Sequence, residues 1–459
     1  MSVRTKTMSV QFRNIRLEWR PVSALKPNPR NARIHSKKQI HQIAQSIIQF
    51  GFINPVLTDG NDNIKVGHGR FEAAKELGLD VIPTICIGHL SEAQIRAYAI
   101  ADNKLALKAG WDLEILAVEF QELSALDLPF DLEITGFETA EIDLLIDGPT
   151  KTQDDPLDHL PAVETPAVTR FGDLWQLGEH KLLCADARNS SSYSELMREE
   201  RARVVFADPP YNVPIDGHVG GLGSIKPRNF AMACGEMSEA QFTHFLQRVF
   251  SNVVEVSLDG AIHFICMDWR HLGEILAAGK AVYTELKNVC VWTKDNGGMG
   301  SFYRSQHELV FVFKKGTAAH VNTIELGGNG RYRTNVWGYR GANTFRQGRL
   351  EDLAMHPTVK PVALVLDAIK DCSRRGEIVL DPFSGSGTTI IAAEKSRRRA
   401  RALEIDALYV DTAIRRWEKL TGSQAIHVLN GRTFAEIAEG RVGSPMGARV
   451  AKSACSKKR

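Results

Sequence analysis

The sequence has few of the features that mark secreted, metal-rich or membrane proteins. Its seven cysteines are scattered and none forms a C-x-x-C pair, which argues against a disulfide framework or a zinc site and favours a reducing cytoplasm. No apolar run approaches the roughly 20 residues of a membrane-spanning helix. The N-terminal segment is charged without an apolar stretch behind it, so neither a secretory signal nor a membrane partner is expected. A formal net charge of +3 permits nucleic acid as a partner without requiring it.

The chain divides into regions of different composition. At 459 residues it is too long for one compact domain. Residues 14–146 mix short apolar runs with helical patterns and form the first predicted domain. Residues 147–169 are rich in Pro, Asp and Thr, which is typical of a linker. Residues 170–435 form the second predicted domain, and the small, basic segment 436–459 is predicted to be disordered.

The second domain alternates apolar strand candidates with amphipathic helices. This alternation predicts a doubly wound α/β fold, with a mostly parallel sheet covered by helices on both faces. The strand candidates are residues 181–186, 203–208, 260–266, 287–292, 308–313, 377–381 and 400–405.

The first motif is VVFADPPYN, residues 204–212. An apolar strand ends at Asp208, and ligands of α/β proteins bind at such carboxyl ends. Pro209 and Pro210 fix a rigid turn and remove backbone donors. The Asp208 carboxylate, the Pro209 carbonyl and the ring of Tyr211 are therefore expected in one crevice. The alternative is a strand end followed by an ordinary proline turn.

The second motif spans residues 377–406. A strand runs into Asp381, then a glycine-rich turn, a helix and a second strand that ends at Glu404. Glycines let the backbone approach a ligand, and a carboxylate at the next strand end suits ribose hydroxyls. Ile390 stands where a dinucleotide fingerprint has its third glycine, and no GK[ST] follows, so neither a dinucleotide site nor a phosphate loop is indicated.

Together these motifs resemble those of the DNA amino-methyltransferases. DPPY is similar to the catalytic motif of that family, DPFSGSGT to its S-adenosylmethionine loop, and HPTVKP (356–361) to the signature before that loop. The catalytic motif precedes the cofactor loop, as in the permuted beta group. The resemblance covers about residues 171–435 and implies S-adenosylmethionine as cofactor, with no metal required.

The resemblance also implies roles for single residues. Asp186 is expected at the cofactor's adenine, Glu404 at its ribose, and the residues of the glycine-rich turn at its methionine part. Lys360 stands where the family has residues around the cofactor, but a solvated surface charge is an open alternative. The implied cofactor-binding set is Asp186, Thr358, Lys360, Asp381, Phe383, Gly385, Gly387 and Glu404.

The expected chemistry follows from the weak nucleophilicity of a base amine, whose lone pair is delocalised into the ring. Asp208 and the Pro209 carbonyl could accept both N–H bonds and localise that lone pair. Tyr211 could stack on a base swung out of the duplex. The sequence has no Pro–Cys step, which disfavours cytosine-C5 chemistry. Cytosine-N4 members more often carry Ser at the position of Asp208, so adenine N6 is favoured and cytosine N4 remains the alternative.

Two basic stretches are predicted to contact double-stranded DNA. The first is the glycine-rich loop after DPPY, and the second is a candidate target-recognition region at 316–355, where arginines are interleaved with aromatic residues. An ordinary exposed insertion is the alternative for the second stretch. The predicted DNA-binding residues are Lys226, Arg228, Arg331, Arg333, Arg340 and Arg346.

Residues 14–110 contain the segments PVSALKPNPRNAR, FGFINPVLTDGNDNIKVGHGRFEAAKELG and PTICIGHLSEAQIRAYAIADNK. These segments resemble the N-terminal domain of ParB-type partition proteins, which implies a smaller α+β, ParB/sulfiredoxin-like fold. In the turn GHGR at a predicted helix start, backbone N–H groups could cradle phosphates while Arg70 pairs with an oxygen. Nucleotide-hydrolysing members usually have GERR, whereas His68 and Gly69 stand in this chain. A bound nucleotide and a DNA-docking module without nucleotide chemistry therefore both stay open, as does a homodimer.

A different class of function is a ParB-like DNA-binding regulator whose methylase half is inactive. The intact DPPY and FSGSG segments and Glu404 argue against this alternative.

Overall fold

The computed structural model describes residues 15–126, 128–148, 158, 165–213, 233, 235–295, 297, 302–324, 333–340 and 359–442. The chain forms two compact units, Met1–Ile146 and Asp147–Arg459. Among the described helices, none has the length and apolar character needed to span a bilayer.

The first unit contains a small α+β fold, as the sequence predicted. Its four-stranded sheet has the order β1-β4-β2-β3. The strands are β1 (Leu17–Pro21), β2 (Val56–Thr58), β3 (Ile64–Val66) and β4 (Val81–Cys86), and the helices are η1 (Val22–Ala24), α1 (Lys37–Phe50), α2 (His68–Glu76), α3 (Glu92–Ala106), α4 (Leu113–Ala125), η2 (Leu132–Thr135) and α5 (Thr139–Asp147).

The second unit is built on one large mixed sheet of the order β11-β9-β10-β8-β7-β12-β13-β6-β5-β14. Its strands are β5 (Leu174–Leu177), β6 (His180–Cys184), β7 (Ala202–Ala207), β8 (Ser257–Met267), β9 (Glu285–Thr293), β10 (His307–Lys314), β11 (Val336–Gly338), β12 (Ile378–Asp381), β13 (Arg399–Glu404) and β14 (Ile426–His427). The five central strands β8, β7, β12, β13 and β6 are parallel, and β10 runs against its neighbours β8 and β9. The predicted α/β sheet is confirmed, with antiparallel pairing towards its edges. The unpredicted strands β5, β11 and β14 are short and lie at or next to those edges.

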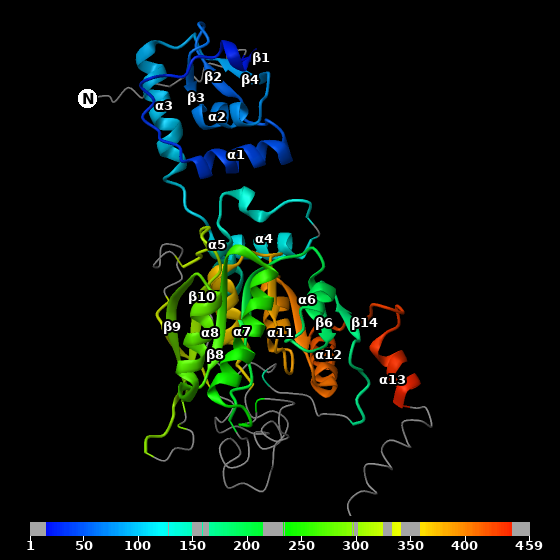
Figure 1. The fold of residues 1–459 in the computed structure, drawn as a ribbon. Helices are drawn as coiled ribbons and strands as arrows, with labels where there is room; N and C mark the ends of the chain where they lie inside the picture. The colour runs from blue at the N-terminus through cyan, green and yellow to red at the C-terminus, as the bar shows by residue number, and fades with distance from the viewer. Residues whose placement is uncertain are drawn as a thin grey trace, which may run out of the picture. The chain divides into compact units, whose positions relative to one another are not determined.

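Helices cover both faces of this sheet (Figure 1). They are α6 (Ser190–Met197), α7 (Glu239–Glu255), α8 (Leu272–Val282), α10 (Val362–Cys372), α11 (Thr388–Ser396) and α12 (Ala407–Thr421), with the short η4 (Trp269–His271) before α8. In β7, Val204 and Phe206 belong to the core that includes α10, α11 and α12, whereas Val205 and Ala207 belong to the core that includes α6, α7 and α8. Alternate residues of a strand point to opposite faces, so a strand buried on both faces is a continuous apolar run.

The strand order reverses between β7 and β12. The chain continues from β7 to β8 on one side and from β12 to β13 on the other, which opens a crevice at the carboxyl ends of these strands. Asp208 directly follows β7, Asp381 ends β12 and Glu404 ends β13. The topology therefore brings the two sequence motifs, about 170 residues apart, to one edge.

Two expected boundaries need correction. Residues 436–442 were expected in a disordered tail but lie in α13 (Phe434–Val442), where Ile437 is only 3% exposed; residues 443–459 lie outside the described residues. Val168 and Thr169, expected at the end of the linker, are buried. Their amides donate to Asp411 at 2.6 and 3.0 Å, so these two residues belong to the sheet unit.

Candidate active site

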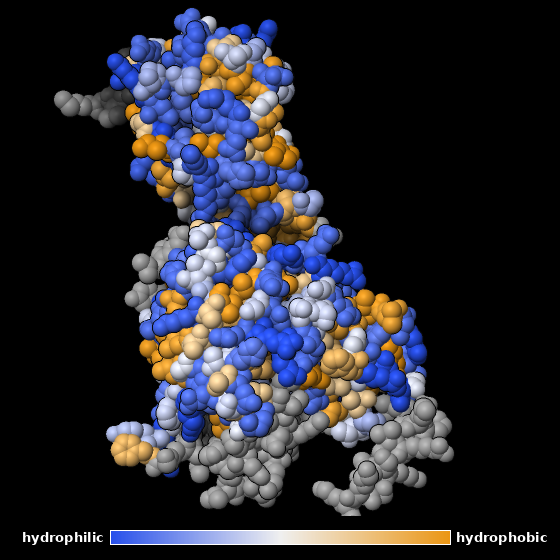
Figure 2. Space-filling view, viewed as in Figure 1, coloured by the Kyte–Doolittle hydropathy of each residue, from blue (hydrophilic) through white to orange (hydrophobic). Residues whose placement is uncertain are grey.

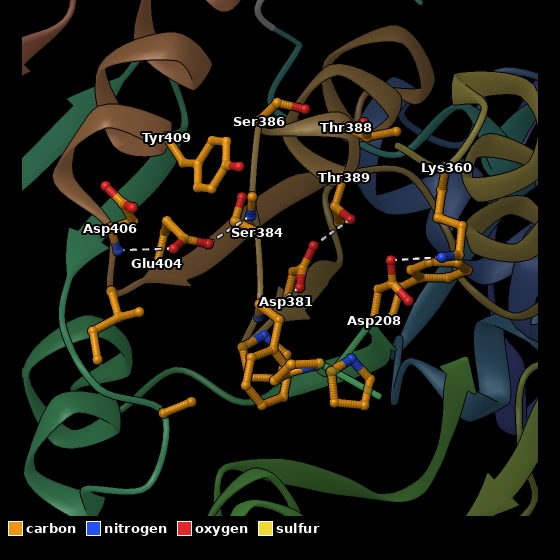
Figure 3. Close-up of a pocket in the computed structure, with 18 of the residues that line it drawn as sticks. Asp208, Lys360, Asp381, Ser384, Ser386, Thr388, Thr389, Glu404, Asp406 and Tyr409 are labelled. Carbon is orange, nitrogen blue, oxygen red and sulfur yellow. Dashed lines mark hydrogen bonds and ion pairs between the residues drawn. The ribbon is translucent and has the colours of Figure 1, made fainter. Parts of the chain in front are cut away.

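A cleft opens at the carboxyl edge of the sheet (Figure 3). It brings together the four expected catalytic residues and every described member of the expected cofactor set except Gly387. The members that line it are Asp186, Asp208, Pro209, Pro210, Tyr211, Lys360, Asp381, Phe383, Gly385 and Glu404. Thr358 lies outside the described residues.

One end of the cleft is formed by the turn between β12 and α11. Glu404 accepts hydrogen bonds from the amides of Gly385 and Asp406, both at 2.8 Å. Asp381 accepts from the Phe383 amide at 2.9 Å and from the Thr389 hydroxyl at 2.6 Å (Figure 3). Burial raises the pKa of both carboxyls to about 7.

The chemistry of this end fits S-adenosylmethionine. Asp381 and Glu404 supply carboxylates for a cationic ligand that carries hydroxyls. The Ser384 hydroxyl is buried without a hydrogen-bond partner among the described residues, although buried polar atoms normally have one. Asp186 accepts from the Arg188 amide at 2.8 Å. Although burial opposes it, the Arg188 guanidinium holds the pKa of Asp186 below its usual value.

Gly387 serves the packing of two helices and is not among the residues that line the cleft. It is the N-cap of α11 with a positive φ of 82°. A Cβ atom there would lie 2.7 Å from the Ala413 Cβ of α12. Gly387 is thus assigned to the contact between α11 and α12, and its direct contact with a ligand stays a prediction.

The other end of the cleft is a cluster of charged groups around Asp208. The Lys360 ammonium lies 2.6 Å from Asp208 Oδ2, and the Tyr211 hydroxyl lies 2.7 Å from Asp208 Oδ1. The Lys360 ammonium is also 3.1 Å from Glu308 Oε2. Lys294 forms an ion pair with the other oxygen of Glu308. The expected crevice is present, and it holds more charge than the sequence indicated.

Burial and pairing govern protonation in this cluster. Burial raises the pKa of the Asp208 carboxyl, and Lys360 opposes that rise. Although burial opposes it, Lys360 and Lys294 lower the pKa of Glu308 to about 2. The Lys360 side chain is 4% exposed, so the alternative of a solvated surface lysine is wrong. It contacts the Asp208 end of the cleft, which the resemblance did not indicate.

Sequence reasoning missed Glu308, Lys294 and Ser384. Glu308 carried a signal, because it is an acidic residue at the start of an otherwise apolar strand candidate. Lys294 follows β9 and faces Glu308 only through the pairing of β9 with β10, which no local pattern reveals.

The expected DNA-contact residues are only partly described. Lys226, Arg228, Arg331 and Arg346 lie outside the described residues. Arg340 is exposed. Arg333 pairs with Asp367 and Asp371, each at 3.2 Å, and its side chain is 17% exposed.

The surroundings of Arg333 correct its expected role. Its guanidinium lies 5.1 Å from the centre of the Trp337 ring, and Trp337 and Tyr339 are themselves buried. An arginine held by two carboxylates beneath buried rings stabilises the fold, so the structure favours a structural ion pair over a phosphate contact.

In the first unit, the GHGR turn starts α2 as expected. Gly67 is the N-cap with a positive φ of 97°. Arg70 donates to the Pro55 carbonyl at 3.3 Å, and its Nε has no partner among the described residues. His68 accepts from the Asn28 amide at 3.1 Å. Phosphate binding at this turn stays a prediction.

A mixed sheet with a glycine-rich turn and acidic residues at neighbouring strand ends defines an α/β enzyme that binds a nucleoside-containing cofactor at its switch point. Comparison with family models gives the family. Residues 202–415 match the DNA methylase model, residues 6–104 the ParB N-terminal domain, and residues 114–171 the ParB-methyltransferase HTH domain. The chain therefore fuses a ParB N-terminal domain, a ParB-methyltransferase HTH domain and an N6/N4-type DNA methylase domain.

Individual proteins resemble the two halves separately. The ParB-like nuclease domain-containing protein YnaK of Escherichia coli is 42% identical over 80 residues, which are 17% of this chain and 92% of YnaK. The DNA adenine methyltransferase YhdJ of E. coli is 26% identical over 242 residues, 47% of this chain and 76% of YhdJ. The crystallised PvuII cytosine-N4-specific DNA methyltransferase is similar with a TM-score of 0.41 and 15% identity, over 59% of this chain and 94% of that one. The HTH region, with α4, η2 and α5, was not separated from the ParB-like domain in the sequence.

We predict that Gly387→Ala destabilises the sheet unit. The substitution places a Cβ against Ala413 and forces a left-handed backbone on alanine, which together should lower the free energy of unfolding by about 2–4 kcal/mol. Calorimetric unfolding of the sheet unit measures this loss.

The matched control is Gly376→Ala. Gly376 has a similar φ of 76° but nothing within 4 Å of an added Cβ, so it should lose only the backbone part, about 1–2 kcal/mol. Equal losses in the two variants would contradict the assigned contact between α11 and α12.

Proposed function

We propose that this protein is a site-specific methyltransferase that moves a methyl group from S-adenosylmethionine to the N6 amino group of adenine in double-stranded DNA. The observation that carries the proposal is Asp208 at the end of β7, in one cleft with Asp381, Glu404 and the glycine-rich turn. Modification-sensitive sequencing of DNA from a methylation-free host that expresses the protein tests it. N6-methyladenine at a defined site is the expected result, and unmodified DNA would contradict it.

In this mechanism the protein's residues orient the amine and localise its lone pair. Asp208 accepts one N–H bond and the Pro209 carbonyl accepts the other, which raises the electron density on nitrogen as it attacks. Bound S-adenosylmethionine supplies an electrophilic methyl group. Phe383, Gly385 and Glu404 would hold it, with Glu404 at the ribose and Asp186 at the adenine. Positioning and electrostatics at these groups account for the catalysis.

Two observations support adenine over cytosine as the target. The motif carries Asp208, whereas family members that modify cytosine N4 more often have Ser at this position. The relative YhdJ is described as a DNA adenine methyltransferase. Cytosine N4 is the second candidate, because the matched DNA methylase model covers both N6 and N4 enzymes. The sequencing experiment separates the two by the modified base.

We predict that Asp208→Ala loses about 10²–10³-fold in the rate of methyl transfer, because one charged acceptor at the reacting amine is removed. The fold should persist, since Lys360 keeps its ion pair with Glu308. Single-turnover transfer of labelled methyl groups to unmethylated DNA measures the rate. Asp268→Ala is the matched control, because Asp268 follows the neighbouring strand β8 and pairs with Arg270. An Asp208→Ala variant that keeps more than about a tenth of wild-type activity would show that Asp208 is not the acceptor at the reacting amine.

We predict that the affinity for S-adenosylmethionine rises with pH through about 7, the pKa to which burial raises Glu404 and Asp381. Below that pH both carboxyls are protonated and lose their attraction for the cationic ligand, so affinity should increase about tenfold from pH 6 to pH 8. Calorimetry at several pH values measures it. Glu404→Gln should remove much of this pH dependence. It also serves as the control for the ligand's own amino group, because titration of that group affects the wild type and the variant alike. A flat wild-type profile would show that neither carboxyl binds the cofactor.

The N-terminal unit is proposed as an accessory DNA-binding module. A second DNA-contacting domain on the same chain raises the effective concentration of the catalytic unit near the duplex. Residues 147–459 alone should therefore lose DNA affinity more than single-turnover rate at saturating DNA, both measured at fixed salt. A truncated protein that is folded and chemically inactive would show that the first unit contributes to the active site.

A further inference from the structure

Four charged side chains of alternating sign meet at the reacting end of the cleft. They are Asp208 after β7, Lys360 before α10, Glu308 in β10 and Lys294 after β9. Lys360 lies between the two carboxylates, at 2.6 Å from Asp208 and 3.1 Å from Glu308. Figure 3 shows Lys360 directed at Asp208. Side chains from four segments of the chain, of which only β10 contributes from within a strand, thus meet at this end of the cleft.

The burial of Lys360 shows that this cluster is more than a surface ion pair. Its ammonium lies 5.4 Å from the centre of the Tyr211 ring and 5.8 Å from that of Trp292. Removing an ammonium from water is costly unless charged partners compensate. Both carboxylates compensate it, and Lys294 balances the second one. A fold that needed only a packed core could use an apolar residue at this position with less cost.

The Tyr211 hydroxyl explains why a second carboxylate is present. It lies 2.7 Å from Asp208 Oδ1 and 3.1 Å from Glu308 Oε2. A phenol has one proton to donate, so it can donate to one of these acceptors at a time. If it turns to Glu308, Asp208 Oδ1 becomes available to an incoming amine, and no buried hydroxyl is left without an acceptor. Glu308 thus offers an alternative partner both to Tyr211 and to Lys360.

We infer that Lys360 and Glu308 are positioning residues with different roles: Lys360 keeps Asp208 ionised and oriented, and Glu308 keeps an oxygen of Asp208 available to accept a hydrogen bond from the target amine. Lys360 holds the negative charge on Asp208. Glu308 draws the Lys360 ammonium and the Tyr211 hydroxyl partly away from it. This inference rests on the proposed function, in which Asp208 is the acceptor.

Other titratable groups among the described residues also act on Asp208. Asp381 from β12 and the buried Cys266 thiol from β8 interact with it electrostatically. Burial raises the pKa of the Cys266 thiol well above its usual value, so that thiol stays neutral. Asp381 titrates near 7, and saturating cofactor removes its effect on binding from the measured rate.

The two positioning residues should shift the pKa of Asp208 in opposite directions. Removing the Lys360 charge removes the attraction that favours the ionised carboxylate, so the pKa of Asp208 should rise. Neutralising Glu308 removes a repulsion and should lower it. Single-turnover methyl transfer is measured from pH 5 to 9 at saturating S-adenosylmethionine and DNA. In Lys360→Met, the pH at which the transfer rate falls off on the acid side, the acid limb of the profile, should rise by about one pH unit or more. Glu308→Gln should move it down and slow transfer near pH 8 about tenfold, because Lys360 and Tyr211 then stay on Asp208.

Two control variants, Lys360→Arg and Glu285→Gln, make the result decisive. Lys360→Arg keeps the positive charge, so the acid limb of its pH–rate profile should stay at the wild-type pH. If thermal unfolding shows that Lys360→Met is not folded, the test rests on the comparison of Lys360→Arg with Glu308→Gln. Glu285→Gln removes a carboxylate from the exposed Glu285–Lys287 pair at the opposite end of β9 and should change nothing. Limbs that stay in place or move in the same direction in Lys360→Met and Glu308→Gln would overturn the inference while the Asp208→Ala result still supports the proposed function. An active Asp208→Ala would remove both.

Discussion

The parallel pairing of β6, β13, β12 and β7 is the constraint on which the rest of the catalytic unit depends. Because these strands run in one direction and the strand order reverses between β12 and β7, their carboxyl ends open onto one crevice. The residues Asp381 and Glu404 at one end of the cleft and Asp208 at the other are far apart in the chain, and this topology brings them to one edge of the sheet. The strand interiors are apolar because helices cover both faces of the sheet. The polar side chains that could take part in chemistry therefore lie at or just beyond the ends of the strands.

The cleft combines two ways of keeping carboxyl groups buried. Asp381 and Glu404 are held by neutral donors, and burial raises the pKa of each to about 7. Glu308 is held by two lysines, and its pKa is about 2. Neutral donors leave Asp381 and Glu404 able to gain or lose charge near neutral pH, whereas the two ammonium partners keep Glu308 ionised. The two ends of the cleft therefore differ in how readily their carboxyl groups change charge.

The sequence was informative wherever a function depends on a local pattern. The apolar strands followed by Asp208, Asp381 and Glu404 predicted the central sheet and the residues at its edge, because burial on both faces gives each strand a continuous apolar run. Glu308 and Lys294 could not be found in this way. Their role arises from antiparallel pairing between β9 and β10 and from Lys360, which comes from a segment outside the sheet. Long-range pairing of charges leaves no periodic signal in a chain.

Arg333 shows that a local sequence pattern can also indicate the wrong binding partner. Arg333 lies in a segment whose mixture of arginines and aromatic residues is typical of nucleic-acid contacts, yet it is bound by Asp367 and Asp371 and lies against buried rings. Both environments require the same side chain, since a guanidinium satisfies a carboxylate and a phosphate with the same planar donors. Composition identifies that an anion will be bound, and only the position of the acidic residues on α10 decides which one. In this fold, the role of a charged residue near the cleft therefore depends on the partner that tertiary packing places against it, as Asp208 and Glu308 are placed against Lys360.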